Sequence, residues 1–290
     1  MTIWPHLEEV ISDKTQSLFH ITTRQSLSGG NINNAFKISN GEQSYFVKMN
    51  RKSQLYMFEA EKIGLECIAD TNTLLVPTPI VTGVYGSESY LVLEYIDLQG
   101  HSDSARFGQK LAQLHLACES RFGFDIDNTI GSTPQVNAWT DSWVKFWQTH
   151  RLGYQLELAH KNGLSHQLIE AGEKLIDKTP YFFTDYAPKA SLLHGDLWSG
   201  NWSANQQGEP VIYDPAPYYG DHEADLAMTE LFGHPGINFY PAYKETFVID
   251  EGYATRKLFY NVYHILNHAN LFGGGYISQA QNAIEQLLVS

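Results

Sequence analysis

The chain has 290 residues, of which 43% are hydrophobic, and a formal net charge of −13. This length and composition suit a globular protein with a sizeable core, and the negative charge argues against nucleic acid, because phosphate binding needs a basic surface. No apolar run of about 18 residues indicates a membrane span. The first residues, MTIWPHLEEV, carry no secretion signal, so a cytoplasmic location is expected.

The two cysteines, Cys67 and Cys118, lie far apart in the sequence and form no metal-binding motif. A disulfide is not expected in a cytosolic protein of this size, so both are interpreted as packing residues. The sequence gives no indication of oligomeric state.

The first third of the chain has the pattern of a β-sheet with one helix. Residues 20–49 alternate around the turn signals SGGN and SNGE, which predicts a β-meander. A helix is predicted over 56–69. Two further strands are predicted within 76–97, joined by a turn at GSES.

After residue 97 the pattern changes to long helices, predicted over 104–121 and 139–175. A short β element surrounds 191–214, and helices return toward the C-terminus. A sheet-rich first third followed by a helical remainder indicates an α+β fold with two lobes. We predict an N-terminal nucleotide-binding lobe over 1–96 and a C-terminal catalytic and substrate-binding lobe over 97–290.

One lysine and one glutamate of the first lobe are candidates for an ion pair. In the strand YFVKM, alternation places Lys48 opposite the face of Tyr45, Val47 and Met49, which has the pattern of a core. Taken alone, Lys48 is as readily a solvated lysine. However, Glu61 shares a helical stripe with apolar residues and needs a cationic partner there. Kinase small lobes use such a pair to hold a lysine against ATP phosphates.

Two backbone segments of the first lobe are candidates for nucleotide contact. The turn with Gly29 and Gly30 could approach phosphates through its N–H groups, although such a turn is more often a plain hairpin turn. The strand that ends at Glu94, Tyr95 and Ile96 lies at the predicted junction of the lobes. Backbone groups there could bind an adenine edge, or this segment could be a simple strand end.

Three polar residues each follow a short hydrophobic run within 191–214. Asp196 and Asn201 stand in SLLHGDLWSGN, and Asp214 ends PVIYD. One carboxylate can accept the proton of a hydroxyl nucleophile, while an amide oxygen and a second carboxylate can hold Mg²⁺ on nucleotide phosphates. Protein kinases use the same interval between their catalytic aspartate and asparagine. Together with Lys48 and Glu61, these residues predict a kinase that uses Mg-ATP.

Longer segments make the sequence similar to the fructosamine/ketosamine kinase family, within the aminoglycoside- and choline-kinase-like group. The most specific are HGDLWSGN at 194–201 and DPAPYYGDHEADLAMTELFG at 214–233, and FGFDIDNTIGSTPQVNAW at 122–139 adds to them. The resemblance spans nearly the whole chain. It implies a bilobal protein-kinase-like fold, with a β-sheet N-lobe that contains one key helix and a mainly helical C-lobe.

The resemblance also implies an activity. Members of the family use ATP to phosphorylate a sugar hydroxyl, that at C3, on a ketosamine that is free or attached to a protein lysine. The product phosphate is unstable, so the reaction removes sugar adducts from amines. Such a deglycating enzyme would act on ribulosamine- or fructosamine-type substrates.

Roles follow for the residues that match the family's motifs. Asp196 resembles the proton acceptor, and Asn201 and Asp214 resemble the Mg²⁺ ligands. Lys48 matches the ATP-phosphate lysine and Glu61 its partner, with Glu59 as a possible substitute. The segment 94–96 matches the adenine-contacting hinge. Because no Ala-Pro-Glu segment follows Asp214, regulation by an activation loop is not expected. The glycine turn lacks the cysteine that serves as a redox switch in some relatives.

Several neighbouring residues are interpreted as structural. His194 is expected to hold the loop that bears Asp196, Asp221 to cap the following helix, and Asp225 to bond the backbone of that loop. His264 and His268 are spaced as zinc ligands can be, but helix packing is the preferred interpretation because no third ligand with suitable spacing is evident.

Two other functions stay open at this stage. One is a kinase for a different small molecule, such as an aminoglycoside, choline or a free sugar. The other is a non-catalytic nucleotide-binding protein with a decayed site, although Asp196, Asn201 and Asp214 all retain competent side chains.

Overall fold

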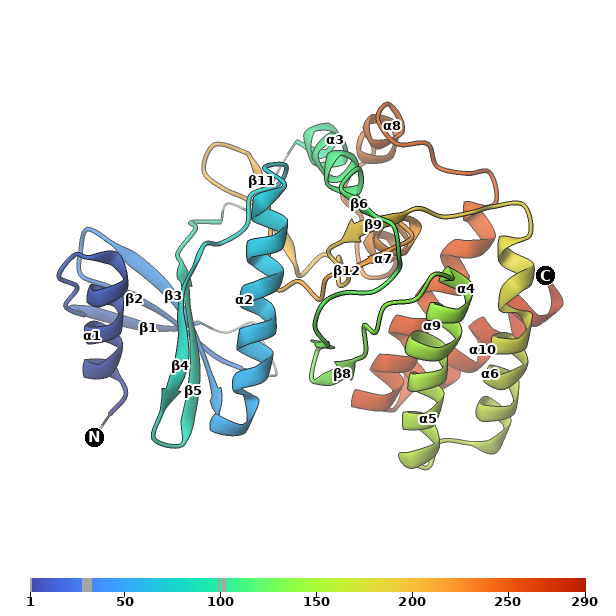
Figure 1. Ribbon diagram of the computed structural model, residues 1–290, viewed down its shortest axis with the longest axis horizontal. Coiled ribbons are helices and arrows are strands. Elements are labelled where there is room, and N and C mark those ends of the chain that lie inside the picture. The colour runs from blue at the N-terminus through green and yellow to red at the C-terminus, as the bar shows by residue number, and fades with distance from the viewer. Residues whose placement is uncertain (1, 28–32, 99, 101–102) are drawn as a thin grey trace. The chain divides into compact units, whose positions relative to one another are not determined.

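Figure 1 shows the computed structural model, which describes residues 2–27, 33–98, 100 and 103–290. The chain divides into two compact units. The N-terminal unit comprises residues up to 102 together with a returning segment, 203–214, and the C-terminal unit comprises 103–202 and 215–290. The functions predicted for the two lobes, and the boundary between residues 96 and 97, stay predictions.

The N-terminal unit holds a five-stranded antiparallel sheet in the order β1-β2-β3-β5-β4. Its elements are α1 (Trp4–Thr15), β1 (Thr23–Leu27), β2 (Asn34–Ser39), β3 (Ser44–Arg51), the 3₁₀ turn η1 (Lys52–Gln54), α2 (Leu55–Asp70), β4 (Pro79–Tyr85) and β5 (Glu88–Glu94). The hairpin of β10 (Trp202–Ala204) and β11 (Pro210–Ile212) returns to this unit. The meander, the helix and the two further strands are therefore confirmed.

Each face of the sheet is covered by one helix (Figure 1). On one face, α1 packs Leu7 and Ile11 against Val47 and Val92. On the other face, α2 packs Phe58 against the strands. The sequence analysis did not predict α1, although Leu7 and Ile11 stand at the spacing of one helical face. This helix covers the apolar face of β3, so Lys48 belongs to the α2 side.

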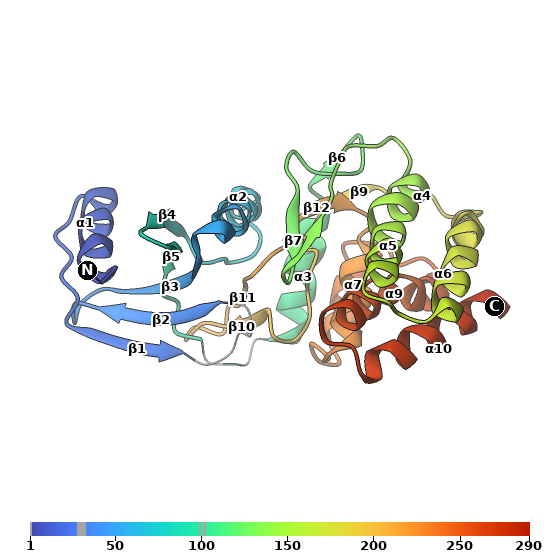
Figure 2. The same cartoon turned by 90° about the horizontal axis from the view of Figure 1, so that it is seen from below.

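The C-terminal unit is mainly helical. Its helices are α3 (Ser104–His115), α4 (Trp143–Phe146), the π-helix η2 (Trp147–Gly153), α5 (Tyr154–Lys161), α6 (His166–Lys178), the 3₁₀ helix η3 (Thr179–Phe183), α7 (Glu223–Leu231), α8 (Phe239–Lys244), α9 (Tyr253–Phe272) and α10 (Gly275–Val289). In both cartoon views α9 lies beside α7 and α10 (Figure 2). The α+β class predicted from the sequence is confirmed.

Two short β elements accompany these helices. One is an antiparallel sheet in the order β12-β9-β6, formed by β6 (Cys118–Glu119), β9 (Ala190–Leu193) and β12 (Tyr218–Gly220). The other is a hairpin of β7 (Asn128–Ile130) and β8 (Thr133–Gln135). The sequence analysis predicted neither β6 nor this hairpin.

The predicted long helices are shorter in the structure. The helix expected over 104–121 ends at His115, because the chain then pairs with β9 as β6. The helical region expected over 139–175 begins at Trp143, after Ser142 accepts a cap hydrogen bond. It is interrupted at 162–165, where Gly163 adopts a positive φ of 74° before Ser165 caps α6.

Both cysteines are free thiols, and Cys67 is half-buried. The packing interpretation is wrong for Cys118, which is exposed because β6 is the edge strand of its sheet. None of the helices that the structure describes is both long and apolar enough to cross a membrane.

Candidate active site

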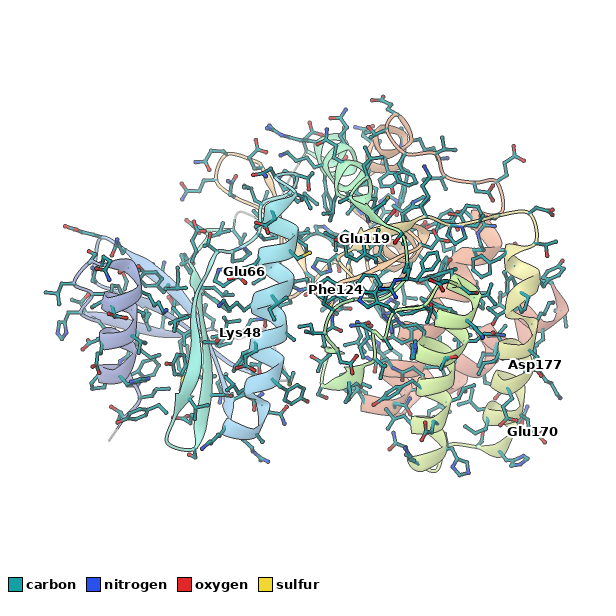
Figure 3. The ribbon with its side chains drawn as sticks, in the orientation of Figure 1. Lys48, Glu66, Glu119, Phe124, Glu170 and Asp177 are labelled. Carbon is teal, nitrogen blue, oxygen red and sulfur yellow. The ribbon has the colours of Figure 1, made fainter. Side chains whose placement is uncertain are left out.

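Lys48 lies within β3 and directs its side chain toward α2 (Figure 3). Its Nζ lies 2.7 Å from Glu61 Oε1 and 2.5 Å from Asp214 Oδ1. The lysine is only 5% exposed and the Glu61 side chain only 12%, so water screens the pair of Lys48 with Glu61 little, whereas Asp214 is open to solvent. The structure thus brings together three of the predicted residues, whereas Glu59, the alternative partner, is exposed on α2.

One ammonium is shared by two acids in this cluster. Burial by itself lowers the pKa of Lys48, but the charges of Asp214 and Glu61 outweigh that effect and raise the pKa above its ordinary value. Burial raises the pKa of Glu61 to about 7, because Lys48 offsets only part of the desolvation and Asp214 adds a like charge. When both carboxyl groups are ionised, they carry one more negative charge than Lys48 neutralises, and a cation can offset it.

Asp214 stands just after β11 with a φ of 57°, in the left-handed region. Aspartate is among the few residues besides glycine that adopt this conformation readily. Its side chain is 48% exposed, although the next residue, Pro215, is buried. The carboxylate that bonds Lys48 therefore stays open to a ligand from solvent.

In the C-terminal unit, the loop after β9 is held by its backbone. The N–H groups of His194 and Gly195 donate to the two carboxylate oxygens of Asp225, at 2.7 Å and 2.9 Å. This confirms the interaction predicted for Asp225. The N–H of Asp196 donates to His194 Nδ1 at 3.2 Å, and His194 is fully buried, as its structural interpretation requires.

A buried histidine that the sequence analysis did not predict, His115, contacts the carboxylate of Asp225. His115, at the end of α3, places Nε2 3.2 Å from Asp225 and Nδ1 2.6 Å from the hydroxyl of Tyr243. Burial alone would raise the pKa of Asp225, but its bonds and charge interactions with His115, His194 and the Gly195 N–H lower it. Asp225 therefore binds the loop as a carboxylate.

Asp196 and Asn201 face each other across one tight loop. Asn201 Nδ2 donates to the backbone carbonyl of Asp196 at 2.9 Å and to its Oδ2 at 3.1 Å. The loop turns between them through the N–H of Trp198, which donates to the Asp196 carbonyl. The five-residue step thus turns the amide of Asn201 back toward the aspartate, and the amide nitrogen makes these contacts.

Gly195 occupies a place that other residues do not fit. Its φ is 81°, and a Cβ there would overlap the carbonyl of Ala216. We expect Gly195→Ala to destabilise the protein by about 1–3 kcal/mol more than Gly208→Ala, because overpacking adds to the cost of a positive φ. Gly208 is the matched control, with a φ of 76° and open space around its Cβ.

Urea unfolding of the two glycine variants measures this difference. Equal losses of stability in Gly195→Ala and Gly208→Ala would show that the backbone conformation alone, rather than contact with Ala216, makes glycine necessary.

The predicted nucleotide segments of the N-terminal unit are only partly described. Gly29 and Gly30 lie outside the described residues. Glu94 ends β5, and its Oε2 accepts a bond from the hydroxyl of Thr78 at 2.8 Å. The next residue, Tyr95, is half-buried and lies under the ammonium of Lys37, 3.9 Å from the ring centre. No backbone hydrogen bond joins Tyr95 or Ile96 to another described residue.

Asp221 was predicted to cap the helix that follows it, and it stands one residue before the N-cap position of α7. The residue before α7 is His222, which makes no side-chain cap, while Asp221 Oδ1 accepts from the N–H of Glu223 at 3.0 Å. Asp221 also accepts bonds from the hydroxyls of Tyr186 and Tyr260. It is fully buried, which agrees with a structural role for this residue.

His264 and His268 both pack within the C-terminal unit on α9. The ring of His268 lies 4.8 Å from that of Phe232, and its Nδ1 contacts the carbonyl of His264 at 2.8 Å. Among the described residues, no group of three or more histidine, cysteine or acidic side chains is arranged to hold a metal. Burial lowers the pKa of His264 to about 3.

This shift predicts a pH dependence. The pKa of His264 is 6.5 in the unfolded chain but about 3 in the folded protein, so protonation as the pH falls below 6.5 favours the unfolded chain. The contribution of neutral His264 to the free energy of unfolding is therefore complete above pH 6.5 and is lost as the pH falls. When the pH is lowered from 7.5 to 5.5, the free energy of unfolding of the wild type should fall by about 1.4 kcal/mol more than that of His264→Gln. Urea unfolding at both pH values tests this, with exposed His160→Gln as control. A constant difference would contradict it.

The fructosamine kinase family model matches residues 3–290. A "Probable ketoamine kinase" of Synechocystis is 49% identical over 98% of this chain and 97% of its own length. The chloroplastic protein-ribulosamine 3-kinase of Arabidopsis thaliana is 43% identical over 92% of this chain and 83% of its own.

Solved structures agree in fold. A "Putative fructosamine-3-kinase" from Haemophilus somnus superposes with a TM-score of 0.90 at 30% identity, over 99% of this chain and 100% of that one. Choline kinase from Streptococcus pneumoniae gives a TM-score of 0.65 at 16% identity, over 98% and 99%, which shows the shared kinase-like fold. The chain therefore belongs to the fructosamine kinase family and is a phosphotransferase that acts on a hydroxyl group.

Proposed function

We propose that this enzyme uses Mg-ATP to phosphorylate the C3 hydroxyl of ketosamines and thereby starts their deglycation. Relatives named ketoamine kinase and protein-ribulosamine 3-kinase support this substrate class. The sugar would be carried by a small amine or by a protein lysine. An acidic enzyme, with a net charge of −13, suits a substrate whose amine is protonated.

The single observation that carries the mechanism is the orientation of Asp196. Its backbone is held through Asp225, and its carboxylate accepts a bond from Asn201, so it is presented in one orientation. We assign it as the general base. The sugar hydroxyl oxygen bonds to the γ-phosphorus, its proton passes to Asp196, and the bond between this phosphorus and the β–γ bridging oxygen breaks, which releases ADP.

Asp214, Lys48 and Asn201 are the residues that fit the phosphates and Mg²⁺. The half-exposed carboxylate of Asp214 and the amide oxygen of Asn201 are hard oxygen donors of the kind that Mg²⁺ prefers. When bound, Mg²⁺ supplies neutralisation of the phosphate charge. The surplus negative charge beside Lys48 fits such a cation, and Lys48 would bind a phosphate oxygen.

The remaining nucleotide contacts are assigned to the backbone. Glu94 would offer its C=O group to the adenine edge, and Tyr95 and Ile96 their N–H and C=O groups, because the N–H of Glu94 already donates to the carbonyl of Thr78. Gly29 and Gly30, which lie outside the described residues, stay predicted phosphate contacts. The backbone of Tyr95 and Ile96, which bonds to no described residue, supports the first assignment.

A substrate panel tests the proposal. Purified enzyme is assayed for phosphate transfer from ATP to ribulosamines, erythrulosamines and fructosamines, each free and attached to a protein lysine. Transfer to at least one ketosamine, with none to choline, aminoglycosides or free sugars, is the expected result. Transfer to those compounds and rejection of every ketosamine would overturn it.

A further inference from the structure

The segment 122–139, FGFDIDNTIGSTPQVNAW, has no role in the chemistry assigned above, yet its hairpin β7–β8 lies against the chain that follows Asp214. The four residues 215–218 are all buried, and two of them, Pro215 and Pro217, have no backbone N–H. The backbone N–H of Ala216 donates to the carbonyl of His194 at 2.9 Å. Because a buried backbone carbonyl needs a hydrogen-bond donor, the carbonyls of this stretch require donors from other parts of the chain.

Two amide side chains of the hairpin supply those donors. Asn128 Nδ2 donates to the carbonyl of Pro217 at 2.8 Å, and Gln135 Nε2 donates to the carbonyl of Ala216 at 3.1 Å. Both side chains are almost fully buried, at 5% and 1% exposure. They also bond to each other, since Gln135 Nε2 donates to Asn128 Oδ1 at 2.8 Å.

Side chains of the helical elements hold the hairpin in place through hydrogen bonds. The hydroxyl of Tyr263 on α9 donates to Gln135 Oε1 at 2.7 Å. The fully buried guanidinium of Arg151 donates to the carbonyl of Val136 and to Asn137 Oδ1, both at 2.8 Å, and lies 4.0 Å from the ring centre of Tyr218. Helical elements and hairpin thus form one hydrogen-bonded support.

The same stretch also touches the loop of the general base. The carbonyl of Ala216, which Gln135 binds, is the atom that a Cβ on Gly195 would overlap. A shift of this carbonyl would therefore disturb the backbone next to Asp196 as well as the chain leaving Asp214.

We propose that Asn128 and Gln135 are positioning residues for Asp214. By binding the carbonyls of Ala216 and Pro217, two and three residues after Asp214, they fix the end of the segment that carries this carboxylate. This proposal rests on the assignment of Asp214 as a Mg²⁺ ligand.

The test measures binding, without turnover. Calorimetry of the full chain with ATP, once with Mg²⁺ and once with EDTA, gives the increase in ATP affinity that depends on Mg²⁺. Asn128→Leu has similar volume but no donor, and should lower this increase by about tenfold, the loss typical of residues that orient metal ligands. ATP affinity in EDTA should stay unchanged.

The matched control is Asn137→Leu. Asn137 is equally buried in the same region and bonds to the carbonyl of Ile126 and to Arg151, but not to residues 216–217. Both variants should lower the melting temperature. Because Asn137→Leu leaves the bonds to the carbonyls of residues 216 and 217 in place, Asn128→Leu should lower the Mg²⁺-dependent gain far more than Asn137→Leu does. Gln135→Met replaces Asn128→Leu should the latter not fold.

The outcomes separate the positioning role from the metal assignment. An unchanged Mg²⁺-dependent gain in folded Asn128→Leu or Gln135→Met would overturn the positioning role, as would an equal loss in Asn137→Leu. Asp214→Ala is measured alongside. If it keeps the Mg²⁺-dependent gain, the metal assignment itself fails. If it loses the gain while both hairpin variants keep it, only the positioning role is overturned.

Discussion

Replacing Asp196 by alanine or asparagine is expected to lower turnover by about a thousandfold or more while ATP still binds. The carboxylate is the only group of its loop that is assigned to accept the hydroxyl proton. Asparagine keeps the size of the side chain and an oxygen that can accept the bond from Asn201 Nδ2. It cannot take up a proton, so the chemical step fails although the loop keeps its shape.

Two measurements separate chemistry from folding in this experiment. Single-turnover phosphate transfer gives the chemical step, and calorimetry gives the affinity for Mg-ATP. Asp177→Asn, on the exposed surface of α6 (Figure 3), is the control for the loss of one carboxylate and should match the wild type. Turnover of Asp196→Asn comparable to the wild type would exclude Asp196 as the base.

The second large effect is expected at Lys48. Lys48→Met removes the ammonium and leaves Glu61 and Asp214 without a cation, although the side chain of Glu61 is only 12% exposed. Breaking a buried ion pair from one side costs about 3–5 kcal/mol, unless the remaining carboxyl takes up a proton. We therefore expect lower stability near pH 8, partial recovery at pH 6 as Glu61 is protonated, and a strong loss of turnover at both pH values.

A double variant separates the structural part of this effect from the catalytic part. Lys48→Met with Glu61→Gln removes the buried charge, so stability should recover while turnover stays low. Lys62→Met is the control, because its partner Glu66 is exposed on α2 and lies 3.7 Å from the ammonium of Lys62, and such pairs contribute about 0–1 kcal/mol to stability. Recovery of turnover in the double variant would remove Lys48 from the phosphate site.

The pairing of Lys48 with Glu61 could be predicted because two local periodicities carry it. Strand alternation placed Lys48 opposite a core face, and the helical stripe of α2 placed Glu61 inward. The link from Asp225 to the loop of Asp196 was likewise predictable, since both lie in segments with strong family motifs. Local pattern and motif together therefore gave the candidate residues.

The supports behind these residues could not be predicted in the same way. His115 reaches Asp225 across 110 positions, and Asn128 reaches Pro217 across 89, so no local period relates them. The strand β6 was taken for helix because Cys118 and Glu119 fit a helix as well as a strand, and only pairing with β9 decides between them. Long-range hydrogen bonds of this kind become visible only in the folded chain.

The most direct test of the central claim is to identify the bond that forms. Wild-type enzyme, Mg-ATP and a single ribulosamine are followed by phosphorus and proton NMR. We predict a phosphoester on the C3 oxygen, formed with equimolar ADP, followed by release of the free amine, and none of these with Asp196→Asn. Phosphate on another position, or ADP formation without any sugar phosphoester, would contradict the account.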